Sequence, residues 1–322
     1  MTDPMAAPLS LYQWGREDTT AKGTAVAATK RMVADMLDFE EAEIVVRPQV
    51  AKGLMIDNPG NELVTMRGTR WRASGPFAFE EFHRWLEMAI KECVTPSGTD
   101  PYTWTHTHDA TANNQVASYT LQRRITDGTN HVDSRVPFAT LETLTLRGDA
   151  NGFVTYEAAG FGRRVENSAI TSVSHPTIEI PPFAASKVYL DPAWASLAST
   201  QLTGPNGVLN WSATIRSGAG LIAPAEARSD LDFGLVVRSG RRIGVDFSAR
   251  VLVATSSGQM ATERTAAEAQ SLRALSLQVA GTNSRAVTLS ALLKHTKGSS
   301  YKVDESDGIG VVDLALGSAT DA

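Results

Sequence analysis

Apolar and polar residues alternate along most of the chain, and this period of two is typical of β-strands. In the first half the alternating stretches are 42–55, 63–71, 102–108, 116–124, 138–147 and 153–159. In the second half they are 208–216, 230–237, 243–254, 274–279, 286–294, 301–303 and 310–316. Runs of Gly, Asn, Asp, Ser or Pro at 73–76, 127–130 and 148–152 predict turns. The pattern therefore predicts a fold built mainly from strands.

Two stretches depart from this alternation and have helical spacing. From Ala78 to Cys93 the apolar residues recur every three or four positions, so they would form one stripe facing a core. From Ala261 to Leu272 the chain consists largely of residues with high helix propensity. We therefore expect a mainly β protein with two short helices.

The same order of elements occurs twice along the chain. The strand and helix at 63–93 correspond to those at 242–274, roughly 180 residues later, and the strands that follow correspond in turn. This order predicts a duplicated domain, each copy a β-sandwich with a helix covering one side. The expected organisation is an extended N-terminal arm at 1–30, a first β domain at 31–165, a Ser/Pro-rich connector at 166–206 with one ordered piece at 187–190, and a second β domain at 207–322.

Composition narrows the functional classes. The chain has 322 residues, of which 42% are hydrophobic and 20% charged, as in ordinary globular domains. Its net charge of −5 argues against a dedicated nucleic-acid binder, which usually has a basic face. Cys93 is the only cysteine, so no internal disulfide can form. No signal peptide is recognisable and no apolar run approaches the roughly 18 residues of a membrane-spanning helix, so no membrane partner is expected.

Motifs that could carry chemistry are few. His106 and His108, with Asp109 beside them, have the spacing of two metal ligands on one side of a strand, but a closed site needs further ligands. Gly160 to Arg164 resembles half of a phosphate-binding loop, yet it opens no helix, so a turn that ends a strand is the better interpretation. Nucleophile-elbow, zincin and Walker motifs do not occur. We therefore expect no enzyme activity, no cofactor, and no catalytic, metal-binding or cofactor-binding residues.

Several strand patterns, taken in order, resemble one known family. They are a small-residue segment at 23–32, a β segment with a proline at 44–55, the strand, turn and helix at 71–93, strands at 102–106 and 117–122, a Leu/Thr-rich strand with a Gly turn at 138–148, and strands at 154–158, 241–247 and 307–312. Together they resemble the major tail tube proteins of siphophages, in the large form of that family. The resemblance covers most of the chain, and it rests on the order of the patterns because no single motif is a ligand signature.

The resemblance implies a β-sandwich with a flanking helix, whose strands join those of neighbouring subunits into a closed tube. The chain would then be a structural virion protein of a phage tail, made in the cytoplasm of a host bacterium, and its stacked rings would form the conduit for genome delivery. Three copies would form a pseudo-hexameric ring if both domains line the tube, and six copies would form the ring if one does. The implied partners are further copies of the chain, a tape-measure protein, and the tail terminator and tail-tip proteins. Double-stranded DNA would pass through the lumen without specific binding.

Two groups of residues are candidates for roles in such a tube. Candidate subunit contacts are Trp14, in an arm with no core of its own, and three basic doublets: Arg123 and Arg124, Arg163 and Arg164, and Arg241 and Arg242. Candidate lumen-facing charges are the acidic residues within strands: Glu142, Glu157 and Asp246. A net acidic wall would repel the phosphates of a passing duplex.

A different class of protein fits the same strand patterns. A β-sandwich binding or adhesion module, for a carbohydrate or a host-surface ligand, would present a shallow site lined by exposed aromatic residues. Such a module can be monomeric, whereas a tube subunit must oligomerise, so the oligomeric state distinguishes the two classes.

Overall fold

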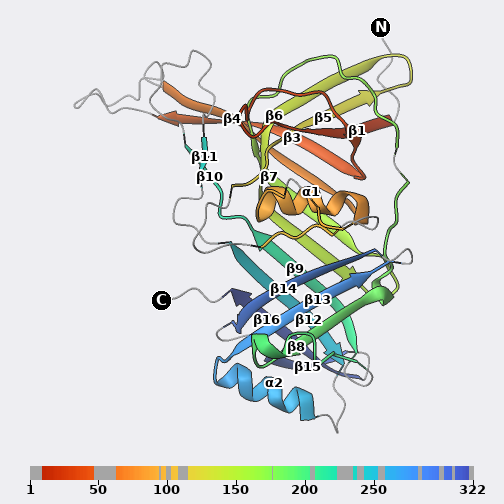
Figure 1. The fold of residues 1–322 in the computed structure, drawn as a ribbon, viewed down its shortest axis with the longest axis vertical. Helices are drawn as coiled ribbons and strands as arrows, with labels where there is room; N and C mark the ends of the chain where they lie inside the picture. Colours follow the sequence, from red (N-terminus) through yellow and green to blue (C-terminus); the bar gives the residue numbers. More distant parts are fainter. Residues whose placement is uncertain are drawn as a thin grey trace, which may run out of the picture.

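The structure, a computed structural model, describes most of the chain. The described residues are 9–46, 63–93, 96–98, 103–107, 115–175, 177–203, 207–222, 235–237, 243–252, 258–281, 285–296, 301–306 and 309–318. The fold is mainly β with two α-helices in this part, which confirms the expected fold class at that level. Figure 1 shows most of the first half of the chain, in red to yellow-green, above most of the second half, in green to blue.

The first half contains seven strands and one helix in the described residues. They are β1 (Leu9–Arg16), β2 (Lys30–Arg31), β3 (Met36–Val46), β4 (Leu63–Pro76), α1 (Phe79–Ala89), β5 (Tyr119–Thr126), β6 (His131–Asp149) and β7 (Thr155–Gly162). The second half contains β8 (Ser186–Asp191), β9 (Val208–Arg216), β10 (Gly220–Ile222), β11 (Leu235–Val237), β12 (Gly244–Leu252), α2 (Gly258–Glu268), β13 (Leu272–Ala280), β14 (Ala286–His295), β15 (Tyr301–Ser306) and β16 (Ile309–Ser318). Short 3-10 turns flank β8 at Phe183–Ala185 and Trp194–Ser196.

All of these strands except β10 and β11 belong to one 14-stranded sheet. Its middle runs in the order β3-β4-β7-β6-β9-β12-β16-β15, and every neighbouring pair is antiparallel. We call these strands the central sheet; each half of the chain contributes four of them. The remaining strands extend the sheet on either side, as β2-β1-β5 beyond β6 and as β8-β13-β14 beyond β16. The two halves are therefore joined by the ladder between β6 and β9 (Figure 1).

The pairing pattern occurs twice, as the order of elements in the sequence predicts. In the first half β3 pairs with β4, β4 with β7, β7 with β6, β6 with β5, and β5 with β1. In the second half β9 pairs with β12, β12 with β16, β16 with β15 and β14, β14 with β13, and β13 with β8. Thus β3 corresponds to β9, β4 to β12, α1 to α2, β5 to β13, β7 to β16 and β1 to β8. The long strand β6 corresponds to β14 and β15 together.

The structure adds ladder partners to two expected segments and corrects a third. In the N-terminal arm, β1 is an extended strand that pairs along eight positions with β5 of the first half. The ordered piece expected at 187–190 in the connector lies in β8, which pairs with β13 of the second half. The turn expected at 73–76 is wrong, because these residues lie inside β4, whose pairing with β7 continues to Pro76. Local composition indicated a turn there because it does not specify a ladder partner that is distant in sequence.

Aromatic side chains from four elements form the centre of the first half. Trp14 on β1 is only 1% exposed, and its ring centroid lies 4.6 Å from that of Trp85 on α1. The Trp85 ring also contacts Trp71 on β4, at 6.1 Å, and Tyr156 on β7, at 5.1 Å. Trp14 therefore packs in the core of its own chain, which corrects the expectation that it needs a neighbouring subunit to be buried.

A buried carboxylate fixes the point at which β6 changes partners. Phe138 has a φ of +54°, a rare backbone conformation for an aromatic residue, and it lies where β6 leaves β5 and begins to pair with β7. The Phe138 N–H donates to the Glu17 carboxylate at 2.7 Å. The same carboxylate accepts hydrogen bonds from Gly23 N, Ser118 Oγ and Thr120 Oγ1. These bonds stabilise the bend that lets one strand serve both parts of the sheet.

A buried cluster of charged groups joins the second helix to the sheet. Glu263 on α2 is buried and accepts hydrogen bonds from the Arg273 guanidinium on β13, at 3.0 and 3.1 Å. His295 on β14 is also buried, and its Nε2 lies 3.5 Å from Glu263 Oε2. Breaking such a buried pair by removing one partner typically costs about 3–5 kcal/mol, so this cluster fixes the position of α2.

The stability of the first half should depend on pH through Glu81. Both carboxylate oxygens of this buried α1 residue lie 3.0 Å from the Val33 N–H. Burial raises the pKa of Glu81 from 4.5 to about 7, although the hydrogen bond from Val33 and the charge of Arg84 act in the opposite direction. Between pH 4.5 and 7 the folded state holds this proton more tightly than the unfolded state, so stability falls as the pH rises through this window.

We therefore expect Glu81→Gln to remove this pH dependence. The loss in the wild-type protein amounts to about 3 kcal/mol at most, and the variant should be more stable than the wild type at pH 8 but not at pH 4.5. Urea unfolding at both pH values measures the difference. An equal effect of the substitution at the two pH values would contradict the role of this carboxyl group.

Candidate functional site: the exposed face and open edges of the central sheet

One face of the central sheet packs on the core and the other is exposed. Along β6 and β9 the buried residues Leu144, Leu146, Ala213 and Ile215 alternate with polar residues, as the pleat of a strand requires. Along β12 and β16, Phe247, Ala249, Leu314 and Leu316 are buried in the same alternation. Since all of these strands share one ladder system, their polar residues lie on one continuous face. We call it the exposed face.

Arginines on the exposed face lie beside carboxylates. Arg147 Nη1 on β6 is 3.0 Å from Glu157 Oε1 on β7, and Arg216 Nη2 on β9 is 2.9 Å from the carboxylate of Asp246 on β12. Arg250 on β12 lies opposite Asp313 on β16, with Nε 3.4 Å from Oδ1. On β4, Arg70 is directly opposite Glu40 and Arg72 directly opposite Asp38. Each of these arginines therefore has a carboxylate in contact with it or directly opposite it on the neighbouring strand.

Two of the three acidic candidates share one row of the exposed face. Glu157 pairs in register with Thr145, Thr145 with Thr214, and Thr214 with Asp246. The two threonine hydroxyls lie 3.0 Å apart across the junction between the halves. The third candidate, Glu142, is at the bulge of β6 between Leu141 and Thr143 and is exposed. The sequence did not reveal the arginine partners, because the pairs depend on which strands become neighbours.

The ladder between β6 and β9 forms a well-packed junction between the halves. Residues 143–149 pair with residues 210–216 without a register shift. At one end, Ser217 Oγ donates to the Leu141 carbonyl at 2.5 Å and Ser217 N donates to the Glu142 carbonyl at 2.9 Å. At the other end, the buried Trp211 ring lies against Gly148, where an added Cβ would be 2.6 Å from the ring. The junction is thus continuous core and not a flexible contact.

A side chain at position 148 should therefore destabilise the junction. Gly148→Val would place methyl groups inside the volume of the Trp211 ring, and overpacking of this kind costs about 1–3 kcal/mol. Thermal unfolding of the variant should begin at a lower temperature than that of the wild type. Gly152→Ala is a matched control in the same turn region, because a Cβ there meets only Asp149 O, at 3.5 Å. Equal losses in both variants would contradict close packing at Gly148.

The two ends of the central sheet are open edges. Among the described residues, β3 pairs only with β4, and β15 pairs only with β16. On β3 the Leu37 carbonyl accepts from Arg123 Nη1 at 3.4 Å, and the Phe39 N–H donates to the Asp38 side chain at 2.9 Å. Both groups therefore point away from β4. Because backbone groups alternate along a strand, the N–H and C=O of Glu41 point the same way.

The basic doublets have partners within the chain where the structure describes them. Arg123 lies at the open edge of β3, where it contacts Asp38 at 3.0 Å and covers the Phe39 ring. Arg163 Nη1 donates to the Gly23 carbonyl at 2.8 Å and lies over the Phe138 ring. Arg164 follows it and is half-buried. Arg241 and Arg242 lie outside the described residues. Of the four doublet residues that the structure describes, Arg123 is the one at an open sheet edge.

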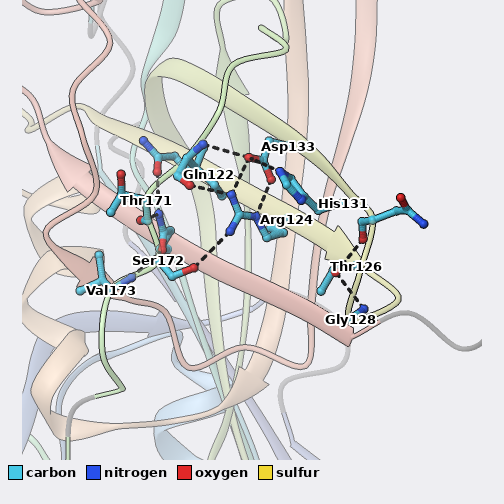
Figure 2. A network of polar contacts seen from close by, with 12 residues as sticks. Gln122, Arg124, Thr126, Gly128, His131, Asp133, Thr171, Ser172 and Val173 are labelled. Atoms are coloured by element: carbon cyan, nitrogen blue, oxygen red, sulfur yellow. Dashed lines mark hydrogen bonds and ion pairs between the residues drawn. The ribbon is translucent and has the colours of Figure 1, made fainter.

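Arg124 belongs to a network that holds the segment after β7 against β1 and β5 (Figure 2). Its guanidinium binds both oxygens of Asp133 at 2.7 Å, which holds the pKa of that carboxyl below its usual range, and Nη2 also donates to the Ile170 carbonyl. Beside it, Gln13 Nε2 donates to Gln122 Oε1 and to the Thr171 carbonyl, both at 2.8 Å. This arrangement makes Arg124 a structural residue of its own chain.

The possible metal motif does not form a site in the described part of the chain. His106 Nδ1 lies 2.9 Å from the Lys91 carbonyl, while His108 and Asp109 lie outside the described residues. Among the described residues, no group of three or more His, Cys, Asp or Glu side chains could hold a metal ion.

Gly160, from the segment that resembles half of a phosphate-binding loop, lies within β7. A Cβ there would be 2.0 Å from the Thr140 carbonyl, so this glycine allows close approach of two strands. No helix in the described residues is long and apolar enough to cross a membrane.

Comparison with known proteins adds no assignment to this site. No protein-family model matches the chain, and no curated protein matches its sequence. The function is therefore argued from the exposed face, the junction and the open edges.

Proposed function

We propose that the chain is the subunit of a phage tail tube, a structural protein that assembles into stacked rings. The observation that carries the proposal is the junction between β6 and β9, which joins two halves of equivalent topology into one continuous sheet. The two strands at the open edges of that sheet correspond, in the repeat, to the two strands that pair at this junction. β3 corresponds to β9, and β15 corresponds to the last part of β6.

A second copy of the chain can repeat the internal junction. If β15 of one copy pairs with β3 of the next, in the antiparallel sense of β6 and β9, the central sheet continues from copy to copy. Open edges of this kind are templates for pairing, and closing the sheet into a ring removes them. Three copies would supply about twenty-four strands, more than the 16–18 that already leave an aqueous channel in a barrel. The ring would then have three-fold symmetry and pseudo-six-fold shape.

The two faces of the central sheet suit this arrangement. The core, with α1 and α2, would lie outside the ring, and the exposed face of hydroxyls and paired charges would line the lumen. Each half would then be a tube domain of the sandwich type. Rings would stack head to tail, a contact that does not close and so produces a filament. Partners of such a tube would be a tape-measure protein, the terminator and tip proteins, and duplex DNA in transit.

Electron microscopy of the purified protein tests this proposal directly. Negative-stain images over a concentration series should show hollow rings or tubes, and rotational averaging should separate three-fold from six-fold symmetry. Uniform small particles at every concentration would overturn the tube proposal. That result would favour the binding or adhesion module, whose ligand would raise its thermal stability.

A further inference from the structure

We propose that the carboxylates of the exposed face, above all Glu157 and Asp246, keep Arg147 and Arg216 from retaining duplex DNA. This inference rests on the proposed function, since it concerns DNA that slides past this face. The carboxylates would act by pairing with the arginines and not by giving the whole wall a negative charge. Removal of the two carboxylates should therefore convert a passive face into one that binds phosphate.

The geometry places each carboxylate where it can compete with a phosphate. The side chains of Arg147 and Glu157 are 56% and 55% exposed, and those of Arg216 and Asp246 are 53% and 43% exposed. The guanidinium groups are thus within reach of a ligand outside the protein. Their planar donors fit phosphate as well as carboxylate, so an arginine without its acidic neighbour is a ready phosphate site.

The pairing recurs on every described strand of the exposed face that carries an arginine. Arg250 has Asp313 beside it, and on β4 Arg70 and Arg72 lie directly opposite Glu40 and Asp38 of β3, of which Asp38 also binds Arg123. Cross-strand neighbours of opposite charge attract one another. A repeated arrangement across four strand pairs is better explained by a property of the whole face than by the stability of single exposed pairs, which is small.

The net charge of the chain alone would not prevent the exposed face from retaining DNA. At physiological ionic strength, charges are screened over about 8 Å, so a phosphate at the face responds to the groups beside it and little to the rest of the chain. Each phosphate contact made by a free arginine also releases counterions and adds to affinity. Along a ring, unpaired arginines would repeat in every subunit and hold the duplex at many points at once. A carboxylate beside each arginine prevents these contacts with the phosphates.

The test is the double variant Glu157→Gln/Asp246→Asn, which keeps the shape of both side chains and removes their charge. Binding to a fluorescent duplex DNA of random sequence is followed by anisotropy between 50 and 200 mM salt. We expect at least about tenfold tighter binding than the wild type at 50 mM salt, and a salt dependence steeper by about two for the two arginines released per chain.

A matched control separates local pairing from overall charge. Asp18→Asn/Asp127→Asn changes the net charge by the same amount, and these exposed carboxylates accept hydrogen bonds from the backbone N–H groups of Thr20, Thr129 and Asn130 in their own turns. This control should bind DNA no better than the wild type. If it binds as tightly as the first variant, overall charge is sufficient and the inference is wrong.

A further variant tests whether the arginines are the groups that bind. Arg147→Gln/Arg216→Gln, added to the first double variant, should return DNA binding to the wild-type level. Binding that persists in this variant, or no gain in the first one, would overturn the inference. Electron microscopy of the same samples keeps the two proposals apart. A gain in binding without rings or tubes would contradict the tube and leave the pairing role standing, whereas tubes without a gain would do the reverse.

Discussion

Glu41→Pro should weaken assembly by more than about tenfold while leaving the folded subunit intact. The N–H of Glu41 points away from β4, on the open edge of β3, so a proline there removes no bond of the β3–β4 ladder. Proline is tolerated on the outer side of an edge strand, where it blocks pairing with a further strand. Loss of a hydrogen bond and a steric clash at each subunit junction should raise the concentration needed for assembly by more than about tenfold.

Sedimentation and negative-stain microscopy across a concentration series measure this shift. Glu41→Thr is the matched control, because it removes the same charge but keeps the N–H and favours a strand. The control should assemble like the wild type. Tubes of normal length from the proline variant would show that the edge of β3 does not pair with another copy.

Trp14→Ala should lower the stability of the isolated subunit more than any other single change considered. Trp14 is almost completely buried, and its ring packs against Trp85 and Tyr119. Truncation of a core tryptophan costs about 3–5 kcal/mol, because it removes apolar contacts and leaves a cavity. Urea unfolding at a protein concentration too low for assembly should show a loss of this size.

The comparison with another tryptophan makes this result specific. Trp194, in the short turn after β8, is 53% exposed, so Trp194→Ala should change the free energy of unfolding by no more than about 0.5 kcal/mol. If Trp14→Ala left the subunit as stable as this control and impaired only assembly, Trp14 would belong to a contact between subunits.

Much of the fold could be predicted because its strands have a clear alternation. The predicted strand at 208–216 coincides with β9, and those at 274–279 and 286–294 lie within β13 and β14. The repeat could be recognised for the same reason, because the two halves share the order of their elements although few of their residues are identical. The segment 103–107 shows the limit: it has strand-like composition, yet it forms only one bridge, from Thr103 to Ser97. Alternation indicates a preference for extended backbone and does not specify a ladder partner.

The candidate site was only partly accessible from sequence. Glu157 and Asp246 could be chosen because acidic residues inside strands must face away from a core. Their arginine partners could not be predicted. Arg216 and Asp246 become neighbours only when β9 pairs with β12, and the separate pair β10–β11 lies between these strands in the sequence. The same reason explains Trp14. Its burial depends on β5, more than a hundred residues away, and not on the polar residues around it.

The covalent link between the two halves also changes what mutation can do. In a ring of six identical domains, every substitution would appear at all six positions. In this chain the two halves have separate codons, so alternate positions around the proposed ring can differ. They already differ: α1 packs Trp85 against Trp14, whereas α2 has a buried ion pair between Glu263 and Arg273 of β13. In the proposed ring, one half could therefore change its core or surface while the other half stays unchanged.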